Sequence, residues 1–219
     1  MQLSLTVIII IITALVSVGA FSSEKMMDDL IFYPPAISER NQWYRFFSCG
    51  LIHADVGHLI FNMLALYLFG QQVETSFKLD LFGRSGGVLY LLLYFSALLF
   101  SLLPTYFKHR NNYGYRSLGA SGAVSAIVFA GLVLIPSLEV FIFFIPIPIP
   151  GFIFAPLYLL LCVILEKRAR DNVNHSAHLW GSIYGLLFVV VGGLAVGYPV
   201  IKNFLIQVKY YMQIKGWIQ

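Results

Sequence analysis

Long apolar runs separated by short polar segments dominate the chain. An α-helix needs about 20 apolar residues to cross the roughly 30 Å of hydrocarbon in a bilayer. Six runs approach that length: residues 1–21, 49–70, 87–106, 118–135, 151–165 and 179–200. The strict alternation expected of a membrane β-barrel is absent from the sequence. The pattern therefore predicts an all-α membrane protein, a bundle of six transmembrane helices forming a single domain over residues 1–219.

The polar segments differ in kind. Residues 22–47 mix charged and aromatic side chains, which suits a long interfacial first loop in the headgroup layer. Residues 145–150 alternate isoleucine with proline, which forbids a helix and predicts an extended entry to the fifth run. Residues 201–219 place three lysines among aromatic and aliphatic residues. That pattern fits an interfacial amphipathic helix or, equally, a frayed tail.

The first run has a second interpretation, because Val18-Gly19-Ala20 resembles the small-residue cleavage site of a secretion signal. No Lys or Arg precedes this run, however, and the run is long enough to span a bilayer. We therefore expect residues 1–22 to be retained as a span.

Composition supports a membrane protein. Apolar residues make up 59% and charged residues 11% of the chain, and the mean hydropathy is +0.81. Soluble domains are closer to half apolar and a quarter charged. The formal net charge of +4 is compatible with contact to anionic membrane lipids. No nucleotide-binding fingerprint appears, and we expect no nucleic-acid partner.

Ser121, in the sequence Gly119-Ala120-Ser121-Gly122, lies just inside the fourth apolar run. A polar side chain at membrane depth is costly unless it faces a partner or a water-filled cavity. His58 and Asn62 are candidate partners and, being four residues apart, share one face of the second helix. His53 is five residues before His58 and is expected to face elsewhere, as a buried structural histidine.

The sixth run carries a further candidate partner, His178. Two glycines follow His178 at helical spacing and share a face with it, Gly181 and Gly185. The fourth run has a matching face of small residues after Ser121, formed by Gly122, Ala126 and Ala130. Small residues let membrane helices approach closely. Packing the two faces together would bring Ser121 within reach of His178, although such spacing also occurs where helices merely pack.

A neutral imidazole in hydrogen-bond range of a serine hydroxyl can take its proton during attack on a carbonyl. The oxyanion that forms needs fixed donors, and His58, Asn62 and the backbone N–H of Ser121 are available. The spans contain neither an HExxH zinc motif nor a pair of acidic residues, which disfavours metalloprotease and aspartyl chemistry.

From Trp43 onward the chain resembles a rhomboid intramembrane serine protease of the minimal six-helix, bacterial type. The matching features, in order, are Arg45, His53, His58, Asn62, Glu74, Gly119-Ala120-Ser121-Gly122, the Pro-Ile alternation, and Ala177, His178, Gly181 and Gly185. The resemblance implies that Ser121 is the nucleophile, His178 the general base and acid, and His58 and Asn62 oxyanion donors. It also implies transmembrane protein substrates cleaved after a small residue, no cofactor or metal, and a multi-pass protein of the bacterial inner membrane.

Two positions depart from the family pattern. The family often has an aromatic residue four positions after the nucleophile, stacked on the catalytic imidazole, where this chain has Ser125. Either a hydrogen bond from Ser125 or packing by another aromatic residue would have to orient His178. The common Trp-Arg pair of the first loop is replaced by Tyr44-Arg45, with Trp43 one place earlier. We expect structural roles for these three loop residues.

Membrane orientation is ambiguous. The resemblance places the N-terminus in the cytoplasm, which leaves nine Lys and Arg residues in outer loops and five in inner ones. The positive-inside rule favours the reverse. We follow the resemblance, because three of the nine lie in the acid-rich first loop.

Three other functions remain open. A catalytically inactive rhomboid-like protein that binds membrane clients would share the fold. A transporter or channel would use histidine and serine side chains as ligands near the bilayer midplane. A metal carrier would be built on His53, His58, His175 and His178.

Overall fold

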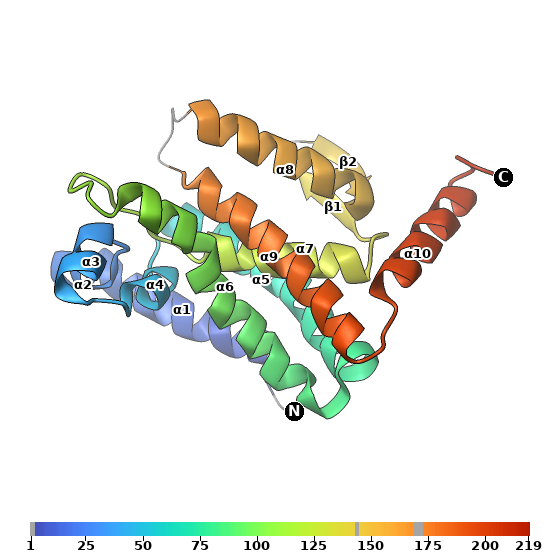
Figure 1. Ribbon diagram of the computed structural model, residues 1–219, viewed down its shortest axis with the longest axis horizontal. Helices are drawn as coiled ribbons and strands as arrows, with labels where there is room; N and C mark the ends of the chain where they lie inside the picture. Colours follow the sequence, from blue (N-terminus) through green and yellow to red (C-terminus); the bar gives the residue numbers. More distant parts are fainter. Residues whose placement is uncertain (1–2, 143–144, 169–172) are drawn as a thin grey trace.

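Helices make up most of the computed structural model, which describes residues 3–142, 145–168 and 173–219 (Figure 1). The α-helices are α1 Leu5–Phe21, α2 Glu24–Leu30, α3 Pro34–Arg40, α4 Arg45–Ser48, α5 Val56–Ser76, α6 Gly86–His109, α7 Ser121–Leu134, α8 Gly151–Arg168, α9 His175–Ala195 and α10 Val200–Ile214. Single turns of other helix types cover Cys49–Leu51, Phe77–Leu81 and Gly83–Ser85. The expected mainly helical fold is confirmed.

A two-stranded antiparallel hairpin separates α7 from α8. Strand β1, Glu139–Ile142, pairs with β2, Ile145–Pro150, and Glu139 lies opposite Pro150. The Pro-Ile alternation is therefore extended, as its missing backbone donors predicted.

Helix α7 lies in the middle of the bundle, where it contacts α5, α6, α8 and α9 (Figure 1). Its 14 residues span about 21 Å, less than the thickness of the hydrocarbon layer. Ser121, the first residue of α7, is half-buried.

Three described helical segments are long and apolar enough to cross a membrane: Val56–Leu81, Gly83–His109 and His175–Ala195. Helices α1 and α7 are apolar but shorter. The helix bounds also differ from the predicted runs by several residues, most clearly for the second run, which begins as a helix only at Val56. The protein is an integral membrane protein, and the count of six spans remains a prediction.

Glycines bring α7 and α9 into backbone contact. A Cβ atom added at Gly181 would overlap the carbonyl oxygen of Gly122, and one added at Gly185 would overlap that of Ala126. These are the two small-residue faces expected to meet. Side chains at Gly181 or Gly185 would force the two helices apart and separate the residues at their ends.

Residues 22–47 form three short helices rather than an irregular loop. Ser23 caps α2 by accepting a hydrogen bond from the N–H of Met26, and two prolines begin α3. The buried side chain of Arg45, at the start of α4, connects α4 to the end of α2 by donating to the carbonyl oxygens of Asp28 and Ile31, each at 2.7 Å. The expected long loop thus has its own local structure, and its place in the headgroup layer remains a prediction.

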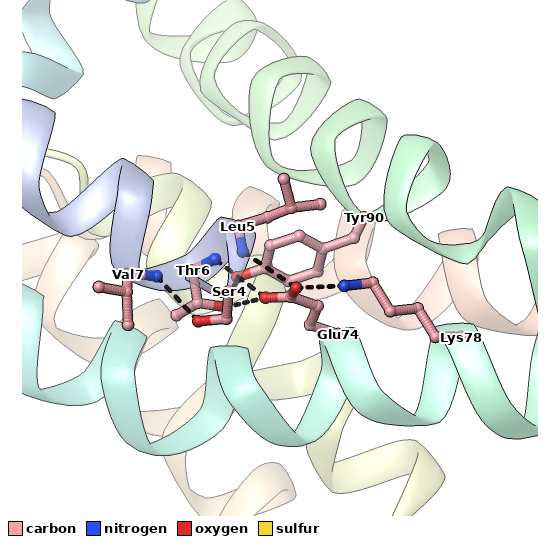
Figure 2. Close-up of polar contacts among 7 residues, drawn as sticks. All are labelled: Ser4, Leu5, Thr6, Val7, Glu74, Lys78 and Tyr90. Carbon is pink, nitrogen blue, oxygen red and sulfur yellow. Dashed lines mark hydrogen bonds and ion pairs between the residues drawn. The ribbon is translucent and has the colours of Figure 1, made fainter. Parts of the chain in front are cut away.

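A buried polar cluster joins α1, α5 and α6 (Figure 2). The Glu74 carboxylate accepts hydrogen bonds from the N–H groups of Leu5 and Thr6, from the Thr6 hydroxyl and from Lys78. Thr6 Oγ1 also lies 2.8 Å from the Tyr90 hydroxyl. Glu74 therefore satisfies N–H groups at the start of α1 that have no partner within the helix.

Candidate active site

Ser121 and His178 meet at the amino-terminal ends of α7 and α9. Ser121 Oγ lies 2.7 Å from His178 Nε2, which is hydrogen-bond distance. For Nε2 to accept the serine proton, the imidazole must carry its own proton on Nδ1. The structure thus brings together the two residues that the sequence paired through their small-residue faces.

The loop before α7 holds Ser121 in place. Gly119 has φ of 109°, a conformation that side-chain-bearing residues rarely adopt, and its N–H donates to the Cys49 carbonyl oxygen at 2.9 Å. Ser121 is the first residue of α7, so its N–H belongs to the turn that has no acceptor within the helix. That N–H is suited to bind a negatively charged oxygen beside the serine hydroxyl.

His53 supports this loop from behind and is fully buried. Its Nε2 accepts a hydrogen bond from the N–H of Ala120 at 3.4 Å, which leaves the proton on Nδ1 to donate to Ser17 Oγ at 3.0 Å. Ser17 in turn donates to the Leu51 carbonyl oxygen. Burial, together with the nearby His58 ring, lowers the pKa of His53 from 6.5 to about 4, so the ring is neutral at pH 7.

His58 lies against the other side of the same loop. Asp55 caps α5 by accepting from the His58 N–H at 2.8 Å, which places His58 in the first turn of the helix. His58 Nδ1 accepts from the Ala54 N–H at 3.4 Å, so the neutral ring carries its proton on Nε2. A Cβ atom added at Gly119 would lie 3.0 Å from that Nε2. His58 therefore offers an N–H donor beside the loop that leads to Ser121.

Asn62 lies one turn after His58 on α5 and is buried. Its Nδ2 donates to the His58 carbonyl oxygen at 2.9 Å. An amide nitrogen carries two hydrogens, so the second can donate to another acceptor.

A cavity of about 410 Å³ opens beside these groups, between α5, α7, α8 and the hairpin. Ser121, His178 and Asn62 line it, and most of the remaining lining is apolar. Ser125 also lines the cavity, and its hydroxyl lies 3.4 Å from the hydroxyl of Tyr158 on α8. The cavity can accept an apolar chain segment and present it to the serine hydroxyl.

Sequence reasoning missed Asn174. This residue caps α9, because its Oδ1 accepts from the N–H of Ala177 at 3.0 Å and from the Thr105 hydroxyl at 3.2 Å. Its Nδ2 donates to the Ser117 hydroxyl at 3.5 Å. Asn174 thus links α6, the loop before Ser121 and the turn that carries His178. An asparagine directly before an apolar helical run was the available signal.

Other residues of the predicted set lie elsewhere or serve packing. Arg45 and Glu74 form the separate clusters described above, and Gly122 lies against Ser101, whose hydroxyl oxygen a Cβ atom there would overlap. Among residues 3–142, 145–168 and 173–219, no three His, Cys, Asp or Glu side chains are grouped so that they could hold a metal.

Two plant proteins are similar to this chain. One is "RHOMBOID-like protein 12, mitochondrial" of Arabidopsis thaliana, 29% identical over 141 residues that cover 59% of this chain and 40% of that protein. The other is "Rhomboid-like protein 15" of the same plant, 28% identical over 172 residues that cover 73% of this chain and 39% of that protein. The matches thus span about two fifths of each relative, and plant relatives do not support the expected bacterial inner membrane.

The family comparison covers most of the chain. The model of the rhomboid domain matches residues 40–195, a range that includes His58, Ser121 and His178. Since this match extends over more than half of the sequence, the chain belongs to the rhomboid family.

Proposed function

We propose that this protein is an intramembrane serine endopeptidase that cleaves transmembrane segments of membrane-protein substrates with a Ser121–His178 dyad. The observation that carries the proposal is the 2.7 Å contact between Ser121 Oγ and His178 Nε2 at the edge of a largely apolar cavity. Rhomboid proteins act in general on membrane proteins within the bilayer, which agrees with that lining.

The reaction proceeds in two steps. In the first, His178 Nε2 takes the Ser121 proton as Oγ attacks the substrate carbonyl carbon, and His178 then returns the proton to the leaving amine. In the second, His178 activates a water that hydrolyses the acyl-serine and releases the carboxylate. The Ser121 N–H, His58 Nε2–H and Asn62 Nδ2–H stabilise the oxyanion formed in both steps.

Six spans, including the short α7, would enclose this site within the membrane. The short α7 also leaves room for water to reach Ser121, and hydrolysis requires that water. The substrates we expect are single-span proteins whose helix unwinds at a small residue, so that an extended segment can enter the cavity.

The second candidate is a rhomboid-like protein that binds membrane clients without cleaving them, since both plant relatives are named rhomboid-like. The two functions share the fold but differ at the serine. Only a protease activates Ser121 toward electrophiles.

A serine-reactive fluorophosphonate tests this difference. The purified protein in proteoliposomes should be labelled at Ser121, the Ser121→Ala variant should not, and the wild type should also cleave a model single-span substrate. Ser125→Ala is the matched control, because it removes another hydroxyl from the same cavity but keeps the nucleophile, so it should still be labelled at Ser121. A wild-type protein that binds the substrate but is neither labelled nor active would instead support the client-binding function.

A further inference from the structure

Helix α10 is the one described α-helix that follows the matched rhomboid domain, and the proposed chemistry gives it no part. Helix α9, which is able to span the membrane, ends at Ala195, and α10 begins five residues later at Val200. The chain turns at Gly197, which has φ of 72°, and α10 then runs in a different direction from α9 (Figure 1). The start of α10 is therefore held close to the membrane surface.

One side of α10 is docked on the protein. Val200 is buried against Gly193, and Gln207 Nε2 donates to the carbonyl oxygen of Leu134 at the end of α7, at 3.0 Å. Tyr211 and Lys215 donate to the Glu139 carboxylate of β1, at 3.2 Å and 3.4 Å. These contacts fix the rotation of the helix about its axis.

The opposite side is exposed and cationic. Lys202 and Lys209 are seven residues apart, which places them on one line along the helix. Ile201, Leu205 and Ile206 beside this line are each more than half exposed. We call the side formed by these five residues the lysine face.

The charge on the lysine face is not balanced by neighbours in the sequence. Residues 200–219 contain three lysines and neither aspartate nor glutamate. Lys215 is paired with Glu139, whereas Lys202 and Lys209 point away from the docked side. Cationic and apolar side chains on one helix face match a lipid surface, where phosphates meet the hydrocarbon.

We propose that the lysine face of α10 binds the headgroups of anionic phospholipids at the membrane surface. Lys202 and Lys209 pair with lipid phosphates, and the adjoining aliphatic side chains enter the boundary between headgroups and acyl chains. The binding does not require that the protein cleaves substrates, so the two proposals can fail separately.

Hydrogen exchange of the full-length protein in nanodiscs tests this binding. One set of nanodiscs contains phosphatidylcholine alone and the other equal parts of phosphatidylcholine and phosphatidylglycerol, with one protein copy per disc. The amides of residues 200–214 should exchange about tenfold more slowly in the anionic discs. High salt should reduce that difference, because it screens charges at the surface.

Lys202→Gln/Lys209→Gln should remove the response, while exchange in α9 stays unchanged and shows that the bundle is intact. The control Lys25→Gln/Arg40→Gln removes the same charge from exposed residues of α2 and α3, at the far end of the molecule from α10 (Figure 1). This control should keep the response. Equal exchange of wild-type α10 in both lipids, or a full response by the lysine variant, would overturn the proposal. Slowing seen only with two copies per disc would assign the lysine face to a second copy.

Discussion

Two polar clusters lie inside this apolar bundle and differ in how their groups are satisfied. The Glu74 cluster is closed: the carboxylate accepts four hydrogen bonds from α1 and Lys78, and the Thr6 hydroxyl also contacts Tyr90 (Figure 2). The Ser121–His178 pair, in contrast, lines an open cavity. Buried polar groups cost free energy unless they are bonded, so the first arrangement suits structure and the second suits reaction with a ligand.

The clusters are also separated along the same helix. His58 lies in the first turn of α5 and Glu74 lies near its end, 16 residues later, which is about 24 Å. Changes in one cluster should therefore leave the other largely intact. The comparison predicts that variants near Ser121 alter turnover at constant stability and that variants of Glu74 do the opposite.

The largest effect is expected at the dyad. Ser121→Ala and His178→Ala should each reduce cleavage of a model transmembrane substrate by about 10⁴-fold or more, because each removes a group that bonds directly to the reacting atoms or moves their proton. Turnover in proteoliposomes measures the effect on catalysis, and the thermal midpoint of unfolding measures the effect on stability. The double variant should lose no more activity than the single ones, and substantial cleavage by Ser121→Ala would contradict the assignment.

His58 is expected to give the next largest effect. Since its Nε2–H lies beside the loop that carries Ser121, His58→Ala should reduce turnover by about 10²-fold. His175 is the matched control, because it is also buried next to the site but begins α9 one turn before His178. His175→Ala should reduce turnover much less. Equal and severe losses in both variants would mean that the wrong imidazole has been given the oxyanion role.

Glu74→Gln should affect stability instead. The amide of glutamine would direct an N–H toward donors that now face a carboxylate, and the ion pair with Lys78, at 2.6 Å, would be lost. We expect a loss of about 2–3 kcal/mol in the free energy of unfolding, the usual cost of a buried charged hydrogen bond. The thermal midpoint measures this loss, with the exposed Glu24→Gln as control. Turnover of the folded fraction should change little. A loss of turnover without a loss of stability would contradict the structural role given to the Glu74 cluster.

The sequence could predict the contact between Ser121 and His178 because the signal for it lies in the spacing within each helix. A series of small residues directly follows Ser121, and another shares a face with His178. Such faces approach closely, as the backbone contacts of Gly181 and Gly185 show. Glu74, in contrast, could be noted only through the family resemblance. Its partners Leu5 and Thr6 come from α1, and Tyr90 of α6 joins the cluster only through Thr6, so no spacing within α5 indicates them.

Signals for the short helices were present in residues 22–47, since Ser23 and Pro34 are typical helix starts. The mixture of charged and aromatic residues concealed them. The contact between Ser125 and Tyr158 had no signal at all, because it depends on how α8 is rotated against α7. Sequence periodicity gives the face of one helix, whereas tertiary packing sets the rotation between two.

The smallest effect is expected at Ser125, whose variants test whether a hydroxyl of the cavity acts on turnover or only on packing. Its hydroxyl lines the reactive cavity, yet its contact to Tyr158 at 3.4 Å is long and joins two neutral groups. If the pair helps to orient His178, Ser125→Ala should lower turnover by about threefold and shift the thermal midpoint little, because a looser imidazole spends less time in the productive geometry.

Tyr158→Phe is the matched variant, because it removes the same hydrogen bond from the side of α8 and keeps the ring. The two single variants and the double variant should then show the same turnover. Full activity of Ser125→Ala would assign the hydroxyl to packing alone. A loss of turnover in Ser125→Ala that Tyr158→Phe does not share would show that Ser125 acts on the site without Tyr158. In that case the contact between Ser125 and α8 would not position His178.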